Sequence, residues 1–84
     1  MSLAEQFAAA QERVKTLKSR PSNEELLELY ALFKQGSVGD VQGSRPGMFD
    51  LKGRAKFDAW TTKKGFSTEK AQQAYVDLVD RLAR

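Results

Sequence analysis

The chain has 84 residues, a formal net charge of +3, and neither cysteine nor histidine, so it has room for a single domain spanning residues 1–84. The lack of cysteine excludes disulfide frameworks and thiolate metal sites. The lack of histidine removes the commonest general base and metal ligand. We therefore expect no metal, no cofactor and no catalysis, and the composition favours a small binding protein.

The longest uninterrupted apolar run is Leu29–Phe33, far shorter than the ~20 residues of a transmembrane helix. The first residues, Met-Ser-Leu-Ala-Glu, have neither the positive nor the apolar region of a secretory signal. These features predict a cytoplasmic protein. The start at Met1 favours a stand-alone chain over a domain cut from a larger enzyme.

An apolar stripe predicts the first helix, because its members alternate at spacings of four and three residues. The stripe comprises Leu3, Phe7, Ala10, Val14 and Leu17. Ser2 and Glu5 have the spacing of a capping box, which predicts the helix start. Pro21 predicts its end, because the residue before a proline is disfavoured in the helical region.

A second helix is predicted from the cap at Ser22 to a terminating Gly36. At ~100° per residue, the apolar side chains of this helix cover an arc of roughly 220° around its axis. That arc is about twice as wide as packing against one face of a core requires. The apolar residues are Leu26, Leu27, Leu29, Tyr30, Leu32 and Phe33. The rest of the apolar arc is expected to face a third helix, a partner or a ligand.

Lys34 falls inside this apolar arc, between Tyr30 and Leu27. If the helix is simply the central one of a bundle, the lysine extends its ammonium to water over a buried stem. That interpretation is favoured by about two to one. The alternative is a ligand site in which Lys34 binds a phosphate, Tyr30 contacts a ring or a hydroxyl, and the leucines contact an apolar tail.

The connection from Gly36 to Phe49 is long and contains four of the six glycines. A crossover of this length is typical of bundles in which two consecutive helices run parallel. Its apolar residues predict that the loop docks on the domain. These residues are Val38, Val41, Met48 and Phe49.

Two further helices are predicted, one from Asp50 to about Lys63, closed by Gly65, and one starting at Ser67 or Thr68. The last carries an apolar face of Ala71, Ala74, Tyr75, Leu78, Val79 and Leu82. No β-alternation is present, so the fold class is all-α, a four-helix bundle.

Three charged residues of the third predicted helix have two interpretations each. Lys52 and Lys56 share a helix face and repel each other unless an anion lies between them, although a solvated face is the commoner case. Asp58, between two aromatic residues, is either a buried acid or, as we favour, exposed or paired with a nearby lysine.

A series of short motifs resembles the acyl-CoA-binding protein (endozepine-like) family over about residues 4 to 82, in one register and without a gap. The motifs are Tyr30-Ala-Leu-Phe33-Lys34-Gln35, Val38-Gly39-Asp40, Arg45-Pro46-Gly47, Asp50, Gly53 and Lys56-Phe57-Asp58-Ala59-Trp60. The resemblance also includes Phe7, Val14-Lys15, Leu17, Pro21, Leu27 and Tyr75. It implies a four-helix bundle with parallel second and third helices that binds and transports medium- and long-chain fatty acyl-CoA esters without catalysis.

The resemblance also implies the ligand-binding residues. Lys15 and Lys34 would contact the CoA phosphates, and Lys56 the ribose 3′-phosphate. Tyr30 and Tyr75 would contact the adenine and ribose. Leu26, Leu27, Ala55 and the stem of Lys52 would border an acyl groove between helices two and three. The predicted ligand-binding residues also include Ala31, Leu32 and Phe33, which belong to the same motif as Tyr30 and Lys34.

The chain departs from the family pattern in three places. Phe33 stands where the family usually has tyrosine, so one hydroxyl contact to the phosphates is missing, worth ~1.5 to 3 kcal/mol at most. Phe57 stands where tryptophan is usual, and Gly36-Ser37 where Ala-Thr is usual. The expected partner is fatty acyl-CoA bound by a monomer, with transient contact to a membrane or an acyl-CoA-using enzyme.

Two other classes of function remain as alternatives. The first is a helical protein-interaction bundle that has lost ligand binding, which Phe33 makes conceivable. The second is a nucleic-acid-binding module, suggested by a pI near 9.4. The small net charge, the absence of a recognition motif and the acidic residues of the second helix argue against nucleic acid.

Overall fold

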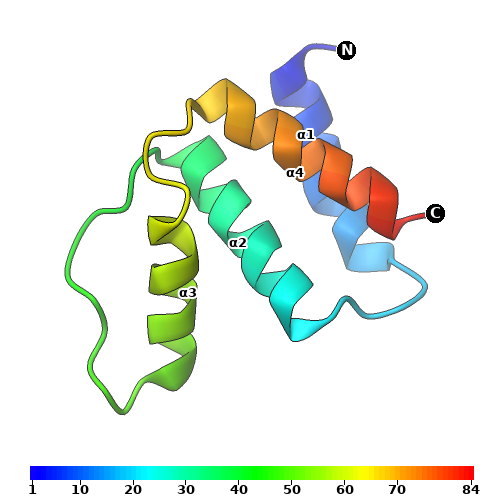
Figure 1. Ribbon diagram of the computed structural model, residues 1–84. Helices are drawn as coiled ribbons and strands as arrows, with labels where there is room; N and C mark the ends of the chain where they lie inside the picture. Colours follow the sequence, from blue (N-terminus) through cyan, green and yellow to red (C-terminus); the bar gives the residue numbers. More distant parts are fainter.

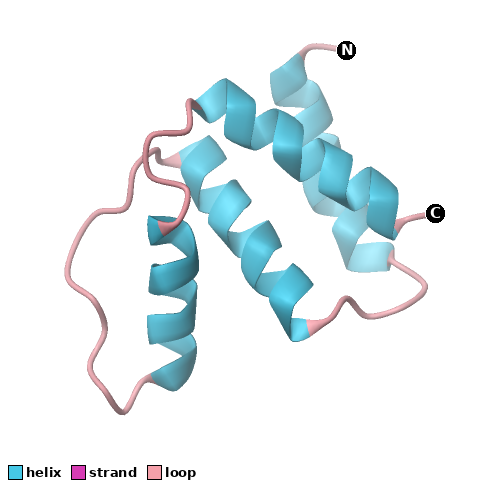
Figure 2. Ribbon diagram, in the orientation of Figure 1, coloured by secondary structure: helices cyan, strands magenta, loops and turns pink.

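Four α-helices and one 3₁₀ turn form the fold in a computed structural model that describes residues 1–84 (Figures 1 and 2). They are α1 (Leu3–Arg13), the 3₁₀ turn η1 (Val14–Thr16), α2 (Asn23–Ser37), α3 (Leu51–Thr61) and α4 (Thr68–Leu82). There are no strands, which confirms the all-α prediction. No helix has the length and apolarity that crossing a membrane requires.

Each α-helix begins at a side-chain cap, as the sequence predicts for three of the four. Ser2 and Ser22 form complete capping boxes with Glu5 and Glu25, and Ser67 accepts a hydrogen bond from the Lys70 amide. Asp50 caps α3 by accepting from the Gly53 amide at 3.0 Å. Local chemistry therefore determines where every helix starts.

The first helix ends earlier than Pro21 indicates, so that prediction was wrong. The α-helix stops at Arg13, and after η1 the chain is extended at Leu17. The Thr16 hydroxyl donates to the Arg13 carbonyl at 3.1 Å, an acceptor that a continuing helix would use.

Gly36 does not terminate α2, which is a second correction. It lies buried inside the helix, where a Cβ atom would come within 3.0 Å of Gln72 Cγ and 3.1 Å of Phe7 Cζ. The left-handed residue is Gly39, with φ +95°, two positions beyond Ser37. Glycine at position 36 therefore serves close packing. Gly65, in contrast, has φ +93° and follows α3 as predicted.

Helix α2 is the centre of the molecule, because it packs against both α3 and α4, while α1 packs on α4. It runs parallel to α3, and the long loop on the outside of the molecule returns the chain to the starting end (Figure 1). The core is formed by Phe7, Ala10, Leu29, Leu32, Tyr75, Val76, Leu78 and Val79. This arrangement confirms both the parallel crossover and the central position of the second helix.

The α2–α3 loop is held by polar groups and not by its apolar residues. Met48 is 67% and Phe49 96% exposed, so the expected docking of these side chains does not occur. Val38 is also exposed, and only Val41 is half-buried. Polar bonds hold the loop, and Met48 and Phe49 remain in solvent.

One of these bonds is the ion pair between Arg45 in the loop and Asp58 on α3. The Asp58 carboxylate accepts from Arg45 Nε at 2.9 Å and from its terminal nitrogen at 2.7 Å. Asp58 is thus exposed and paired, as we favoured, but its partner is an arginine. The Arg45 hydrogen bonds lower the pKa of Asp58.

A buried amide joins the end of α2 to the start of the loop and to the turn between α3 and α4. Gln35 is fully buried, and its Nε2 donates to Asp40 at 2.8 Å and to the Phe66 carbonyl at 2.9 Å. Asp40 also accepts from the Gly65 amide at 2.8 Å, and this bond, followed by that from Gln35, lowers the pKa of Asp40. The contacts tie α2, the loop and the α3–α4 turn together, and so fix α3 beside α2.

Candidate functional site

A cavity of about 470 Å³ lies between the N-terminal halves of α2 and α3. Its lining consists of Arg20, Asn23, Leu26, Leu27, Tyr30, Leu51, Lys52, Ala55 and Lys56. Six of the residues predicted from the sequence therefore meet here: Leu26, Leu27, Tyr30, Lys52, Ala55 and Lys56. Parallel packing brings them together, because it places the starts of both helices at the same end of the molecule (Figure 1).

The cavity combines apolar walls with positive charge. Arg20, Lys52 and Lys56 line it, and no carboxylate does. The salt bridges of the protein use Arg13, Lys15, Arg45 and Lys63, so the three cations of the cavity have no acidic partner. Unpaired cations beside apolar walls suit a ligand with an anionic head and an apolar tail.

Two cation–π contacts continue the site along the seam between α2 and α3. Lys56 Nζ lies 5.3 Å from the centre of the Tyr30 ring. One turn further along both helices, Lys34 Nζ lies 4.9 Å from the centre of the Trp60 ring. The helices exchange roles between the two pairs, so each supplies one cation and one aromatic ring. Lys34 is half-buried and Lys56 is exposed, and neither ammonium is paired with a carboxylate.

The aromatic residues Tyr75 and Phe33 lie with the core at Phe7 and do not line the cavity. Tyr75 is 4% exposed and its ring stands edge-on to Phe7, with centres 5.2 Å apart. Burial raises the pKa of Tyr75. Phe33, half-buried, lies 6.3 Å from Phe7 between ring centres. A ligand contact by either residue stays a prediction.

Three other predicted residues also lie outside the cavity. Ala31 is fully buried, and Leu32 belongs to the core cluster. Lys15 is in η1, where its ammonium pairs with Glu12 at 3.0 Å on the exposed surface. The structure therefore brings Lys34 and Lys56 to one seam, while Lys15 lies on another element.

Three further residues that the sequence did not predict line the cavity, namely Arg20, Asn23 and Leu51. Leu51 was detectable, because it precedes Ala55 by one helical turn and therefore shares its face. Arg20 and Asn23 flank the Pro21-Ser22 start of α2, and only the packing of α3 beside that start shows that they line a cavity.

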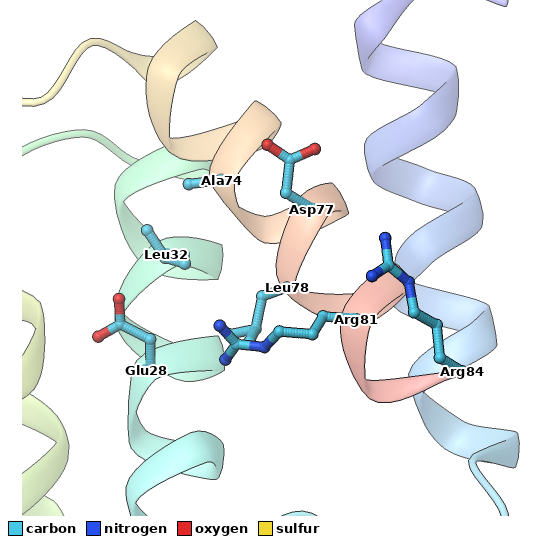
Figure 3. A pocket seen from close by; sticks show the side chains of 7 residues that line it. All are labelled: Glu28, Leu32, Ala74, Asp77, Leu78, Arg81 and Arg84. Carbon is cyan, nitrogen blue, oxygen red and sulfur yellow. The ribbon is translucent and has the colours of Figure 1, made fainter.

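A second cavity, of about 450 Å³, lies between α2 and α4 (Figure 3). Its floor includes Leu32, Ala74 and Leu78, and Arg81 reaches from α4 toward Glu28 on α2. Two carboxylates, those of Glu28 and Asp77, line this cavity together with the arginines, and Glu28 already pairs with Lys63. The balance of opposite charges makes this cavity less suited to an anion than the α2–α3 cavity.

Comparison with known proteins places the chain in a family. The family model described as "Acyl CoA binding protein" matches residues 4–79. The acyl-CoA-binding protein homolog 1 of Caenorhabditis elegans is 61% identical over 82 residues, 98% of this chain and 93% of the relative. The homolog from Manduca sexta is 59% identical over 83 residues, 98% of this chain and 92% of the relative.

A solved structure supports the same family. Acyl-CoA-Binding Protein 2 of Oryza sativa superimposes with a TM-score of 0.91 at 46% identity, covering 95% of this chain and 87% of that one. The chain belongs to the acyl-CoA-binding protein family. This membership favours ligand binding over both the protein-interaction bundle and the nucleic-acid module.

Proposed function

We propose that this protein binds medium- and long-chain fatty acyl-CoA esters and buffers and transports them without catalysis. One observation carries the proposal, namely the α2–α3 cavity, which has apolar walls and three unpaired cations but no carboxylate. Family membership supports it, because relatives over the whole chain are named for acyl-CoA binding. The charged head of such a ligand matches the unpaired cations of the site, and its apolar tail matches the apolar walls.

In this proposal the cations of the seam hold the phosphates. Lys34 contacts the CoA diphosphate and Lys56 the ribose 3′-phosphate, while Tyr30, already beside Lys56, stacks near the adenine and ribose. Lys15 and Tyr75 approach the head group from η1 and α4. Because Lys15 is paired with Glu12, it exchanges that exposed partner for a phosphate.

The acyl chain lies in the α2–α3 cavity against Leu26, Leu27, Ala55 and the stem of Lys52. Each buried methylene contributes ~0.8 kcal/mol, so a sixteen-carbon chain supplies on the order of 10 kcal/mol before ordering costs. Affinity therefore rises with chain length until the groove is full.

The bound thioester is protected and not turned over. A chain without cysteine or histidine offers neither a thiol nor an imidazole to attack it. Palmitoyl-CoA incubated with the protein should release free thiol no faster than palmitoyl-CoA bound to serum albumin. Faster release would show an enzyme. We place this carrier in the cytosol as a monomer, which cell fractionation and analytical ultracentrifugation test.

Calorimetric titration with palmitoyl-CoA tests the proposed function. We expect saturable binding of one ligand per protein, with free CoA and free palmitate each binding far more weakly. The reason is that each of these ligands satisfies only one half of the site. No heat at micromolar protein would refute the proposal.

A further inference from the structure

The α2–α3 cavity has a polar end. Leu26 and Leu27 line it along α2, and Arg20 and Asn23 line it before them, where α2 begins. Along the helix axis, Asn23 lies about two turns, or ~10 Å, from Tyr30, which we place beside the head group. The end of the cavity that lies farther from the proposed head-group contacts therefore carries a guanidinium and an amide.

Both polar groups at this end are available to a ligand. The capping bonds at the start of α2 join Ser22 with Glu25 and involve neither Arg20 nor Asn23. The salt bridges of the protein also leave Arg20 without a carboxylate partner. A guanidinium that lines a cavity and has no acid to pair with is suited to binding an anion there, and its planar fork matches a carboxylate.

The anions of the CoA head group do not account for Arg20. In the proposed function Lys34 and Lys56 contact the phosphates, and the tail lies against the leucines between Tyr30 and Arg20. A plain hydrocarbon end gains nothing from the guanidinium, because it offers neither a negative charge nor a hydrogen-bond acceptor. A tail that itself ends in an anion matches both the apolar walls and the polar end of the cavity.

We propose that the cavity also accepts fatty acyl-CoA esters whose chain ends in a carboxylate, and that Arg20, assisted by Asn23, binds this terminal carboxylate. The inference rests on the proposed function, because it uses the same orientation of head group and tail. It adds a class of ligand, the mono-CoA thioesters of long-chain dicarboxylic acids. Arg20 is then a specificity-determining residue, which selects the chain end and leaves the binding of ordinary acyl chains unchanged.

Chain length decides whether the terminal carboxylate reaches Arg20. A chain that is too short ends among the leucines, where an ionised carboxylate loses hydration without gaining a partner. A chain that spans the cavity places its carboxylate beside the guanidinium. The contribution of Arg20 should therefore appear for a dicarboxylic chain of about sixteen carbons and be absent for one of about six.

Calorimetry with three CoA thioesters tests the proposal: that of hexadecanedioic acid, that of its monomethyl ester, and palmitoyl-CoA. Arg20→Gln should weaken binding of the dicarboxylic ligand about fivefold, since an ion pair open to solvent contributes modestly. The other two ligands should bind Arg20→Gln and wild type equally, because neither has a charge at the end of its chain. The six-carbon thioester, hexanedioyl-CoA, should also show no dependence on Arg20.

Lys18→Gln is the matched control. It removes the same charge from an exposed residue of the same segment, but Lys18 does not line the α2–α3 cavity. This variant should therefore keep the wild-type ratio between the affinities for the dicarboxylic ligand and for its methyl ester, whereas Arg20→Gln should lower that ratio. An equal fall in the ratio for both variants would show a general effect of charge and would overturn the proposal.

Two other results would also overturn it: equal losses for all three sixteen-carbon ligands in Arg20→Gln, which would move Arg20 to the head group, or no loss for the dicarboxylic ligand. Failure of the proposed function has a different signature, because wild type would then not bind palmitoyl-CoA. Binding of palmitoyl-CoA without an Arg20-dependent gain from the carboxylate would refute only the terminal-carboxylate site. Absence of binding by both ligands would refute the function and this site together.

Discussion

Lys34 and Lys56 provide two of the unpaired positive charges on the seam between α2 and α3. We expect Lys34→Ala and Lys56→Ala each to weaken palmitoyl-CoA binding about tenfold, because a hydrogen bond to a charged group contributes ~1.5 to 3 kcal/mol. The loss should shrink as salt is added. Calorimetry at two salt concentrations measures both effects.

Lys64→Ala is the control for these variants, since Lys64 is an exposed lysine in the turn after α3 and outside the cavity. It should leave affinity unchanged. If the Lys34→Ala/Lys56→Ala double variant kept the affinity and salt dependence of the wild type, the assignment of the phosphate site would be wrong.

At Phe33 the resemblance to the family predicts a tyrosine, so this chain is expected to lack one hydroxyl there. Phe33 is half-buried beside Phe7, so part of its ring is exposed, and a tyrosine there would add one hydroxyl donor. Phe33→Tyr should tighten palmitoyl-CoA binding by about tenfold. Phe57→Tyr, which adds a hydroxyl on α3, should not. Equal affinities for Phe33→Tyr and wild type would remove residue 33 from the phosphate site.

At the scale of the elements, Gln35 connects α2 with the long loop and with the turn before α4. Gln35→Ala should lower the free energy of unfolding by about 2 kcal/mol, because it removes two hydrogen bonds and leaves the Phe66 carbonyl without its donor. Urea denaturation measures this change. Gln73→Ala, at an exposed glutamine that bonds only to Asp77, should cost a few tenths of a kcal/mol. Similar losses for both variants would contradict a structural role for Gln35.

Asp40 makes the stability of these contacts between α2, the loop and the α3–α4 turn depend on pH. Its pKa is lowered in the folded protein, first by the Gly65 amide and then by Gln35, so the folded state favours the ionised form. The stabilisation is complete above the ordinary value near 3.8 and is lost as the pH falls from there through the lowered folded value. The pKa values of Asp58 and Glu5 are also lowered and act in the same direction.

Thermal unfolding followed from about pH 7 to about pH 2 tests this linkage. The melting temperature of the wild-type protein should fall on acidification. The melting temperature of Asp40→Asn should fall less steeply, because this variant has no carboxylate at position 40 to protonate. Parallel curves for the two proteins would show that Asp40 makes no contribution.

At the scale of the whole molecule, local sequence signals determined the helices. The capping boxes at Ser2 and Ser22 and the cap at Ser67 predicted three helix starts to within a residue. The long crossover predicted that α2 and α3 run parallel, and the wide apolar arc predicted that α2 is central. Each of these signals lies within one stretch of chain, so sequence reasoning could detect it.

Two of the three wrong predictions, those for Gly36 and for the loop, involve contacts between different elements of the fold, whereas the early end of α1 is local. Gly36 resembled a helix terminator, but Phe7 and Gln72 approach it so closely that a Cβ atom there would require them to shift by a few tenths of an ångström. The apolar loop residues were expected to dock, yet Arg45–Asp58 and the Gln35–Asp40 contact hold the loop without Met48 or Phe49. These pairings depend on tertiary packing, which composition and periodicity do not contain.

The site shows the same division. The resemblance to the family supplied Tyr30, Lys52 and Lys56, which the fold then gathered in one cavity. Arg20 lines the cavity because α3 packs beside the start of α2, and this packing cannot be read from the sequence. Lys15 and Tyr75 lie outside the cavity, so their contacts with ligand depend on the bound complex.

The central claim is that acyl-CoA occupies the seam between α2 and α3, and backbone amide NMR during titration with palmitoyl-CoA tests it most directly. The largest shift changes should fall on Leu27, Tyr30, Lys52 and Lys56, and should saturate at one ligand per protein. Changes centred on Leu78 and Arg81, at the cavity between α2 and α4, would contradict the account, as would changes that never saturate.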